Sequence, residues 1–102
     1  MSQKAQFERL LREGIRRSVA GYTFFVERRD AGGPRLGLLV TRKHARRASE
    51  RNRIKRAVRE AFRLEQESLG PVDVLVRPPY GIESSPKMIV RLREILISLS
   101  SA

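Results

Sequence analysis

The chain has 102 residues, a formal net charge of +11 and no cysteine, so we expect a single domain spanning residues 1–102 and exclude a disulfide scaffold. One histidine, His44, is too few for a zinc finger or a two-histidine metal template. Without a long apolar stretch or a signal-peptide pattern, the sequence predicts a cytoplasmic protein that does not enter a membrane.

The chain begins with the pattern of a short amphipathic helix over residues 3–13. Phe7, Leu10 and Leu11 recur at helical spacing, and Gly14 follows where a left-handed cap would end the helix. This spacing predicts a helix with one apolar face that packs on another element.

Two alternating segments follow this helix. Residues 22–26 and residues 35–41 both carry apolar side chains with a period of two, which is typical of strands. Residues 29–34 between them contain two glycines and a proline, which favour a turn. We therefore predict that the two strands pair as a hairpin.

The second half of the chain predicts a helix, a strand and a helix. The first helix begins near residue 48 or 49, with Ser49 as a possible N-cap, and runs to about Gln66. Residues 72–76 alternate valines between proline-containing breaks and form a short strand. The last helix starts at Ser85-Pro86, an N-cap followed by proline at the first helical position.

Positive charge is concentrated in the middle helix and the connection before it. Residues 42–63 hold ten of the 22 Lys and Arg residues and only two carboxylates. On a helical wheel an apolar stripe made of Ile54, Ala57, Val58, Ala61 and Phe62 lies opposite an arc made of Asn52, Lys55, Arg56, Arg59 and Arg63. Because two carboxylates cannot neutralise so many cations, the pattern predicts an external polyanion as partner.

The segment Arg51-Asn52-Arg53-Ile54-Lys55-Arg56, continued by Arg59-Glu60-Ala61-Phe62-Arg63, resembles the "RNR" signature of the bacterial ribonuclease P protein subunit. The similarity extends to residues 7–14, to residues 35–43 and to residues 73–76, and so covers nearly the whole chain.

The resemblance implies an α+β fold, an α-β sandwich of order αβββαβα that is like domain 2 of ribosomal protein S5. Its mixed sheet has about four strands and contains a left-handed βαβ crossover, against the usual preference for right-handed connections. The residue pattern alone shows only three strands. The fourth is expected near residues 17–20 or in the loop after Thr41.

The resemblance also implies the protein subunit of ribonuclease P, the endoribonuclease that removes the 5′ leader of precursor tRNA. In that family the RNA subunit carries the chemistry with Mg²⁺, which is bound mainly through RNA, and no catalytic residue is expected on this chain. The expected partners are ribonuclease P RNA and precursor tRNA, with no further protein required. The residues expected to bind the catalytic RNA are Arg42, Lys43, Arg46, Arg47, Arg51, Asn52, Arg53, Lys55, Arg56 and Arg59.

A second site implied by the resemblance is a cleft between the first helix and the sheet, which takes the single-stranded leader. Phe7, Tyr22 and Phe25 are the candidates for a stacking floor, and the candidate flanking cations are Lys4, Arg9 and Arg42. Each of the three aromatic residues is equally compatible with an ordinary place in the core. Phe24 and Phe62 are assigned to the core.

Two other classes of function stay open at this point. A small ribosomal or other RNA-binding protein would share the size and charge. A metal-dependent nuclease would need clustered carboxylates, for which the nearest pairs are Glu65 with Glu67 and Glu27 with Asp30. His44 is interpreted as a surface loop residue, because no acid–base partner is evident near it.

Overall fold

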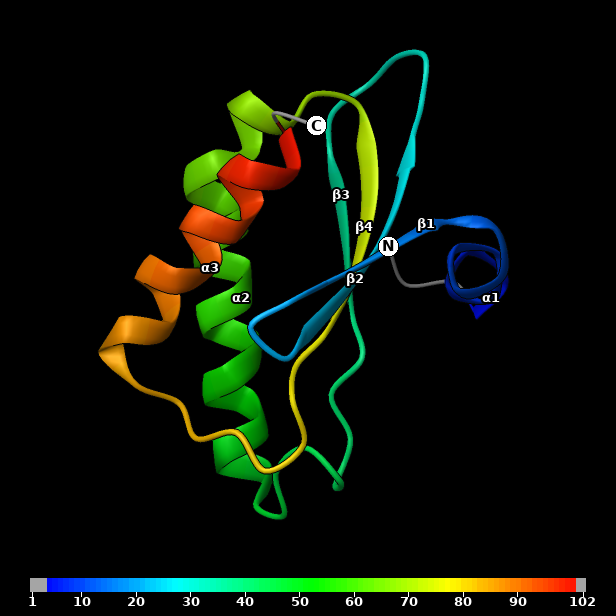
Figure 1. Ribbon diagram of the computed structural model, residues 1–102. Helices are drawn as coiled ribbons and strands as arrows, with labels where there is room; N and C mark the ends of the chain where they lie inside the picture. The colour runs from blue at the N-terminus through cyan, green and yellow to red at the C-terminus, as the bar shows by residue number, and fades with distance from the viewer. Residues whose placement is uncertain (1–3, 101–102) are drawn as a thin grey trace.

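A computed structural model describes residues 4–100, which form the element order αβββαβα (Figure 1). The helices are α1 (Lys4–Glu13), α2 (Ala48–Leu69) and α3 (Pro86–Ser100). The strands are β1 (Ile15–Val19), β2 (Tyr22–Arg28), β3 (Arg35–Leu38) and β4 (Val72–Arg77). None of the described helices is both long and apolar enough to cross a membrane.

The four strands form one mixed sheet in the order β1-β2-β4-β3. Strand β2 is antiparallel to both β1 and β4, whereas β3 is parallel to β4. Helix α2 connects the parallel pair, so β3, α2 and β4 make the βαβ crossover of the fold. This arrangement confirms the predicted fold class, and it places the fourth strand at residues 15–19, before β2 and not after Thr41.

The predicted hairpin between residues 22–26 and 35–41 is wrong. Strand β4 lies between β2 and β3 and pairs with both of them. The reason is that residues 72–76 of β4 are all buried. A strand that is covered on both faces lies in the centre of a sheet and not at its edge. The actual hairpin joins β1 to β2 through Ala20 and Gly21, which both have positive φ angles.

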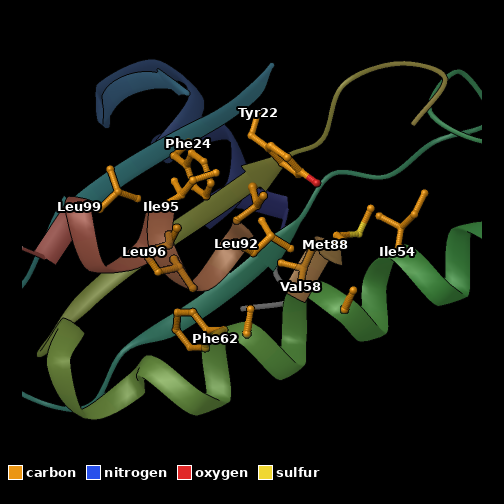
Figure 2. Close-up of a cluster of buried hydrophobic side chains, with 14 of the residues drawn as sticks. Tyr22, Phe24, Ile54, Val58, Phe62, Met88, Leu92, Ile95, Leu96 and Leu99 are labelled. Carbon is orange, nitrogen blue, oxygen red and sulfur yellow. The ribbon is translucent and has the colours of Figure 1, made fainter. Parts of the chain in front are cut away.

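The two faces of the sheet are covered unequally. Helices α2 and α3 lie together on one face and α1 lies on the other (Figure 1). The larger cluster of buried side chains lies under α2 and α3 and includes Phe24, Ile54 and Leu92 (Figure 2). The smaller cluster lies under α1 and consists of Leu10, Phe25 and Leu75, with Phe7 and Leu39 packed against it. The apolar stripe predicted for the middle helix is buried as expected.

Helix α1 ends at Glu13 and α3 begins at Pro86, as predicted, whereas α2 continues to Leu69, three residues beyond the predicted end near Gln66. The predicted caps of α1 and α2 are not formed. Helix α2 starts one residue before Ser49, with Arg47 at the N-cap position and no capping side chain. Gly14 does not have a positive φ angle. It closes α1 through a hydrogen bond from its N–H to the Leu10 carbonyl oxygen (2.9 Å), and a Cβ there would lie 2.6 Å from that oxygen. The predicted helix start at Gln3 lies outside the described residues.

Candidate functional site

The basic face is the surface formed by α2 and the connection before it. Four cations of the connection are exposed: Arg42, Lys43, Arg46 and Arg47. On α2, Asn52, Arg53, Arg56 and Arg59 are exposed, whereas Arg51 and Lys55 are half-buried. Apart from the half-buried Lys55, the predicted arc is confirmed as solvent-facing. Residues three or four apart share one side of a helix, and the opposite side of α2 packs on the sheet.

Only some of these cations are engaged by the protein itself. Arg51 donates from Nη1 to the carbonyl oxygens of Ala45 and Arg46, both at 3.0 Å, and so braces the preceding loop. Arg53 lies 3.7 Å from a carboxylate oxygen of Glu50. Among the cations of the basic face, those whose side chains make no hydrogen bond or ion pair with residues 4–100 are Arg42, Lys43, Arg46, Arg47, Lys55, Arg56 and Arg59. These uncompensated charges form a surface suited to phosphate groups.

His44 is buried, in contrast to the prediction that it is a surface residue. Its side chain is 1% exposed, and its Nδ1 accepts a hydrogen bond from the Thr41 N–H at 2.8 Å. The ring lies 4.7 Å from the ring of Tyr80, and the His44 carbonyl oxygen accepts from the Gly81 N–H at 3.1 Å. Burial, and then the charge of Arg77, lower the pKa of His44. His44 thus ties the connection before α2 to the segment after β4.

The second candidate site lies between α1 and the sheet. The Phe7 ring packs where β3 carries Gly37, since a Cβ at that position would lie 2.9 Å from Phe7 Cε1 and 3.1 Å from Leu75 Cδ1. Phe25 is 5% exposed, and the Arg16 guanidinium carbon lies 6.0 Å from its ring centroid. Phe7 and Phe25 are therefore brought together as predicted, but chiefly as the packed floor beneath α1.

Tyr22 does not belong to this site. It is 2% exposed and lies in the larger cluster, with its ring centroid 6.2 Å from that of Phe24 (Figure 2). Successive side chains of a strand point to opposite faces, so Tyr22 and Phe24 face α2 and α3 while Phe25 faces α1. The period of two already contained this signal, and it excludes a shared floor for Tyr22 and Phe25.

The cations of α1 are partly neutralised by neighbouring carboxylates. Lys4 lies 3.9 Å from Glu8. Arg9 lies 3.3 Å from Glu13 on the same helix and 3.2 Å from Glu27 on β2. Only the pair between Arg9 and Glu27 joins α1 to the sheet, and its Arg9 side chain is largely exposed, so it stabilises the contact only weakly.

A charged cluster at the edge of the same face was missed by the sequence analysis. Asp73 on β4 is 6% exposed, receives two hydrogen bonds from Arg35 on β3 at 2.7 and 2.8 Å, and lies 3.0 Å from Nε of Arg29. Burial raises the pKa of Asp73, but the hydrogen bonds and charges of the two arginines outweigh it and the pKa is lowered. The period of two in β4 puts Asp73 on the same face as Leu75 and Arg77, which is the α1 side. This alternation is the sequence signal that could have predicted a buried carboxylate there.

The carboxylate pairs considered for a nuclease do not converge on a metal site. Glu65 is buried between helices and paired with Arg93 at 2.8 Å, and Glu27 is paired with Arg9. Across residues 4–100 no three His, Cys, Asp or Glu side chains gather as metal ligands would. The described residues therefore do not fit a protein-held metal centre.

Comparison with known proteins links this geometry to one family. The sequence model of the family described as Ribonuclease P matches residues 1–96. The chain is 42% identical over 76 residues to the "Ribonuclease P protein component" of Thioalkalivibrio sulfidiphilus, covering 74% of this chain and 63% of that protein. It is 43% identical over 77 residues to the component of the same name from Haemophilus influenzae, covering 76% and 65%. These alignments span less than two thirds of each relative.

Two solved structures share the fold. The RNase P protein from Thermotoga maritima superposes with a TM-score of 0.76 at 24% identity, covering 97% of this chain and 92% of that one. The RNase P protein of Staphylococcus aureus gives a TM-score of 0.73 at 22% identity, covering 98% and 93%. Both similarities cover nearly the whole of this chain.

Proposed function

The chain belongs to the ribonuclease P protein family, and on that premise we propose that it is the RNA-binding subunit of a ribonuclease P that removes the 5′ leader of precursor tRNA in the cytoplasm. In this proposal the RNA subunit carries the chemistry. The protein binds the catalytic RNA on its basic face and the leader along the α1 side of the sheet.

The observation that carries the proposal is the unneutralised charge of the basic face. Seven cations there make no side-chain hydrogen bond or ion pair within residues 4–100, although the chain holds 11 carboxylates. Guanidinium groups bind two phosphate oxygens at once, and Asn52 adds a neutral donor and acceptor beside them.

On the α1 side of the sheet we propose a contact with the leader that is weaker than the contact of the basic face with the catalytic RNA and that tolerates different leader sequences. The Phe7 and Phe25 rings shape the floor there, and Lys4, Arg9 and Arg42 are the cations proposed to flank the leader. Tyr22 is excluded from this role because it faces the larger cluster. Cations that bind phosphates along this floor make few base-specific contacts, which fits a leader that differs between substrates.

Magnesium enters the proposal through the RNA. The reaction is expected to need Mg²⁺ to activate the attacking water and stabilise the leaving oxygen. Because the described residues offer no cluster of metal ligands, we propose no protein ligand for the ion. The protein's part is to hold the two RNAs together and to reduce the repulsion between their phosphates.

The test is cleavage of a precursor tRNA at limiting Mg²⁺ by a bacterial ribonuclease P RNA. The reaction is run with the RNA alone, with the chain alone and with both. Cleavage that requires both at low Mg²⁺ supports the proposal. Lack of stimulation by the chain would indicate a general RNA-binding protein instead, and cleavage by the chain alone would place the chemistry on the protein and overturn the proposal.

A further inference from the structure

A pocket of about 470 Å³ joins the basic face to the α1 side of the sheet. Its lining residues come from three parts of the fold that are distant in sequence: the end of β3, the connection before α2 and the segment at the end of β4. They are Leu39, Thr41, Arg42, Lys43, His44, Arg77 and Tyr80. None of them was assigned to leader binding by the sequence analysis except Arg42, as a flanking cation.

Tyr80 is the unusual member of this pocket. It is 63% exposed, although tyrosine is normally at least half covered in folded proteins. Its ring lies 4.7 Å from the His44 ring at an interplanar angle of 39°. The hydrogen bond from the Gly81 N–H to the His44 carbonyl oxygen holds the adjoining backbone. The ring is thus supported by a buried side chain and still open to solvent.

The charges around Tyr80 are all of one sign. Arg42, Lys43 and Arg77 line the pocket, and no carboxylate does. Arg77 reaches Thr23 only through a long hydrogen bond of 3.4 Å, and the side chains of Arg42 and Lys43 have no partner in the described part of the chain. The pocket therefore combines an exposed aromatic ring with available cations. Proteins build sites for single-stranded nucleic acid from these two elements.

We propose that this pocket binds one nucleotide of single-stranded RNA, with the base stacked on Tyr80 and the adjoining phosphates held by Arg42, Lys43 and Arg77. The inference rests on the proposed function and names its stacking residue. Phe7 and Phe25 are largely covered by packing, so they offer a base little free ring surface, whereas Tyr80 offers an open ring. The leader is the favoured source of the nucleotide because the pocket continues the α1 side of the sheet through Leu39.

The first test needs no catalytic activity. The chain has no tryptophan and two tyrosines, of which Tyr22 is buried and Tyr80 is exposed. Stacking of a base on Tyr80 should quench the intrinsic tyrosine fluorescence when a short single-stranded oligoribonucleotide is added to the full chain. The Tyr80→Phe variant should bind the oligonucleotide and show no such quenching. Binding by the wild-type chain without any change in its tyrosine fluorescence would overturn the inference.

The second test uses the holoenzyme reconstituted with a bacterial ribonuclease P RNA. Tyr80→Ala should weaken the binding of a precursor tRNA by roughly 5- to 150-fold and leave mature tRNA binding unchanged, whereas Tyr80→Phe should bind the precursor like the wild-type chain. Val90→Ala removes an exposed apolar side chain on α3, away from the pocket, and should change neither affinity. An abasic nucleotide scanned through the leader should reproduce the Tyr80→Ala loss at one position only.

The outcomes separate this inference from the function on which it rests. Failure of the wild-type chain to stimulate cleavage would refute the proposed function, while the fluorescence test would still decide the pocket. If Tyr80→Ala weakens assembly with the catalytic RNA and leaves precursor tRNA binding unchanged, the nucleotide in the pocket comes from the catalytic RNA. That result supports the nucleotide-binding pocket and replaces the leader as the source of the nucleotide. Unchanged affinities for both RNAs, or equal losses in Tyr80→Ala and Tyr80→Phe, would contradict base stacking on this residue.

Discussion

Removing two cations from the centre of the basic face should change how RNA binding depends on salt. Arg56 and Arg59 are exposed on α2 and make no side-chain hydrogen bond or ion pair within residues 4–100. Alanine is the strongest helix former, so the double variant Arg56→Ala/Arg59→Ala should keep α2 intact. Any loss of affinity for the catalytic RNA then reports lost phosphate contacts and not lost folding.

The magnitude follows from counting contacts. Each phosphate contact contributes about 0.7 to 0.9 to the slope of log affinity against log salt concentration, so two lost contacts should flatten the slope by about 1.4 to 1.8. Between about 50 and 200 mM salt, the wild-type chain should therefore lose roughly 7- to 12-fold more affinity than the double variant. The two chains should converge in affinity as the salt concentration rises.

The assay is equilibrium binding of labelled ribonuclease P RNA at a series of salt concentrations and constant Mg²⁺. The control variant Lys87→Ala/Arg91→Ala removes the same net charge from exposed positions on α3, outside the basic face. Its slope should match that of the wild-type chain. Parallel wild-type and Arg56→Ala/Arg59→Ala slopes, or equal flattening in the control, would refute the assignment of specific phosphate contacts to α2.

Three further predictions concern the residues that support these surfaces. Asp73→Asn removes the buried negative charge that pairs with Arg29 and Arg35. It should lower the free energy of unfolding, measured by urea titration, by about 1 to 3 kcal/mol. Because the folded-state pKa of Asp73 is lowered, the stability from its charge is present at neutral pH and should be lost in the wild type as the pH falls below about 4. Gly37→Ala places a Cβ 2.9 Å from Phe7 and should cost about 1 to 3 kcal/mol of stability, whereas Gly33→Ala, with no atom within 4 Å, should not show this overpacking loss. Because the folded-state pKa of His44 is lowered, the free energy of unfolding should fall as the pH drops below about 6.5. This fall should be absent from His44→Asn. The same fall in the variant would show that His44 is not its cause.

Much of the fold followed from local periodicity. On α2 the apolar residues recur every three or four positions, and so do the cations on the opposite side of the helix. The structure buries the apolar stripe and, except for the half-buried Lys55, exposes the cationic arc, as predicted. The alternating valines of β4 and the Ser85-Pro86 start of α3 were found for the same kind of reason. Strand β1, which has exposed residues throughout, was expected only from the family resemblance because it has no apolar alternation.

The candidate site was predicted less completely. The cations of the basic face were all identified, because charge density is a property of the sequence itself. The internal partners of Arg51 and Arg53 and the pocket around Tyr80 were not foreseen. Tyr80 and Arg77 approach Arg42 only because β4 ends beside the connection before α2.

The sequence by itself determined which faces of the helices and strands are apolar and where positive charge gathers, because both are carried by neighbouring residues at fixed spacing. Only the tertiary structure decided that β4 separates β2 from β3, and that His44 is buried against Tyr80. It also decided that Phe7 can lie over Gly37. These features depend on contacts between segments that are distant along the chain, whose free energy is set by the packing of the whole sheet and is absent from any local pattern.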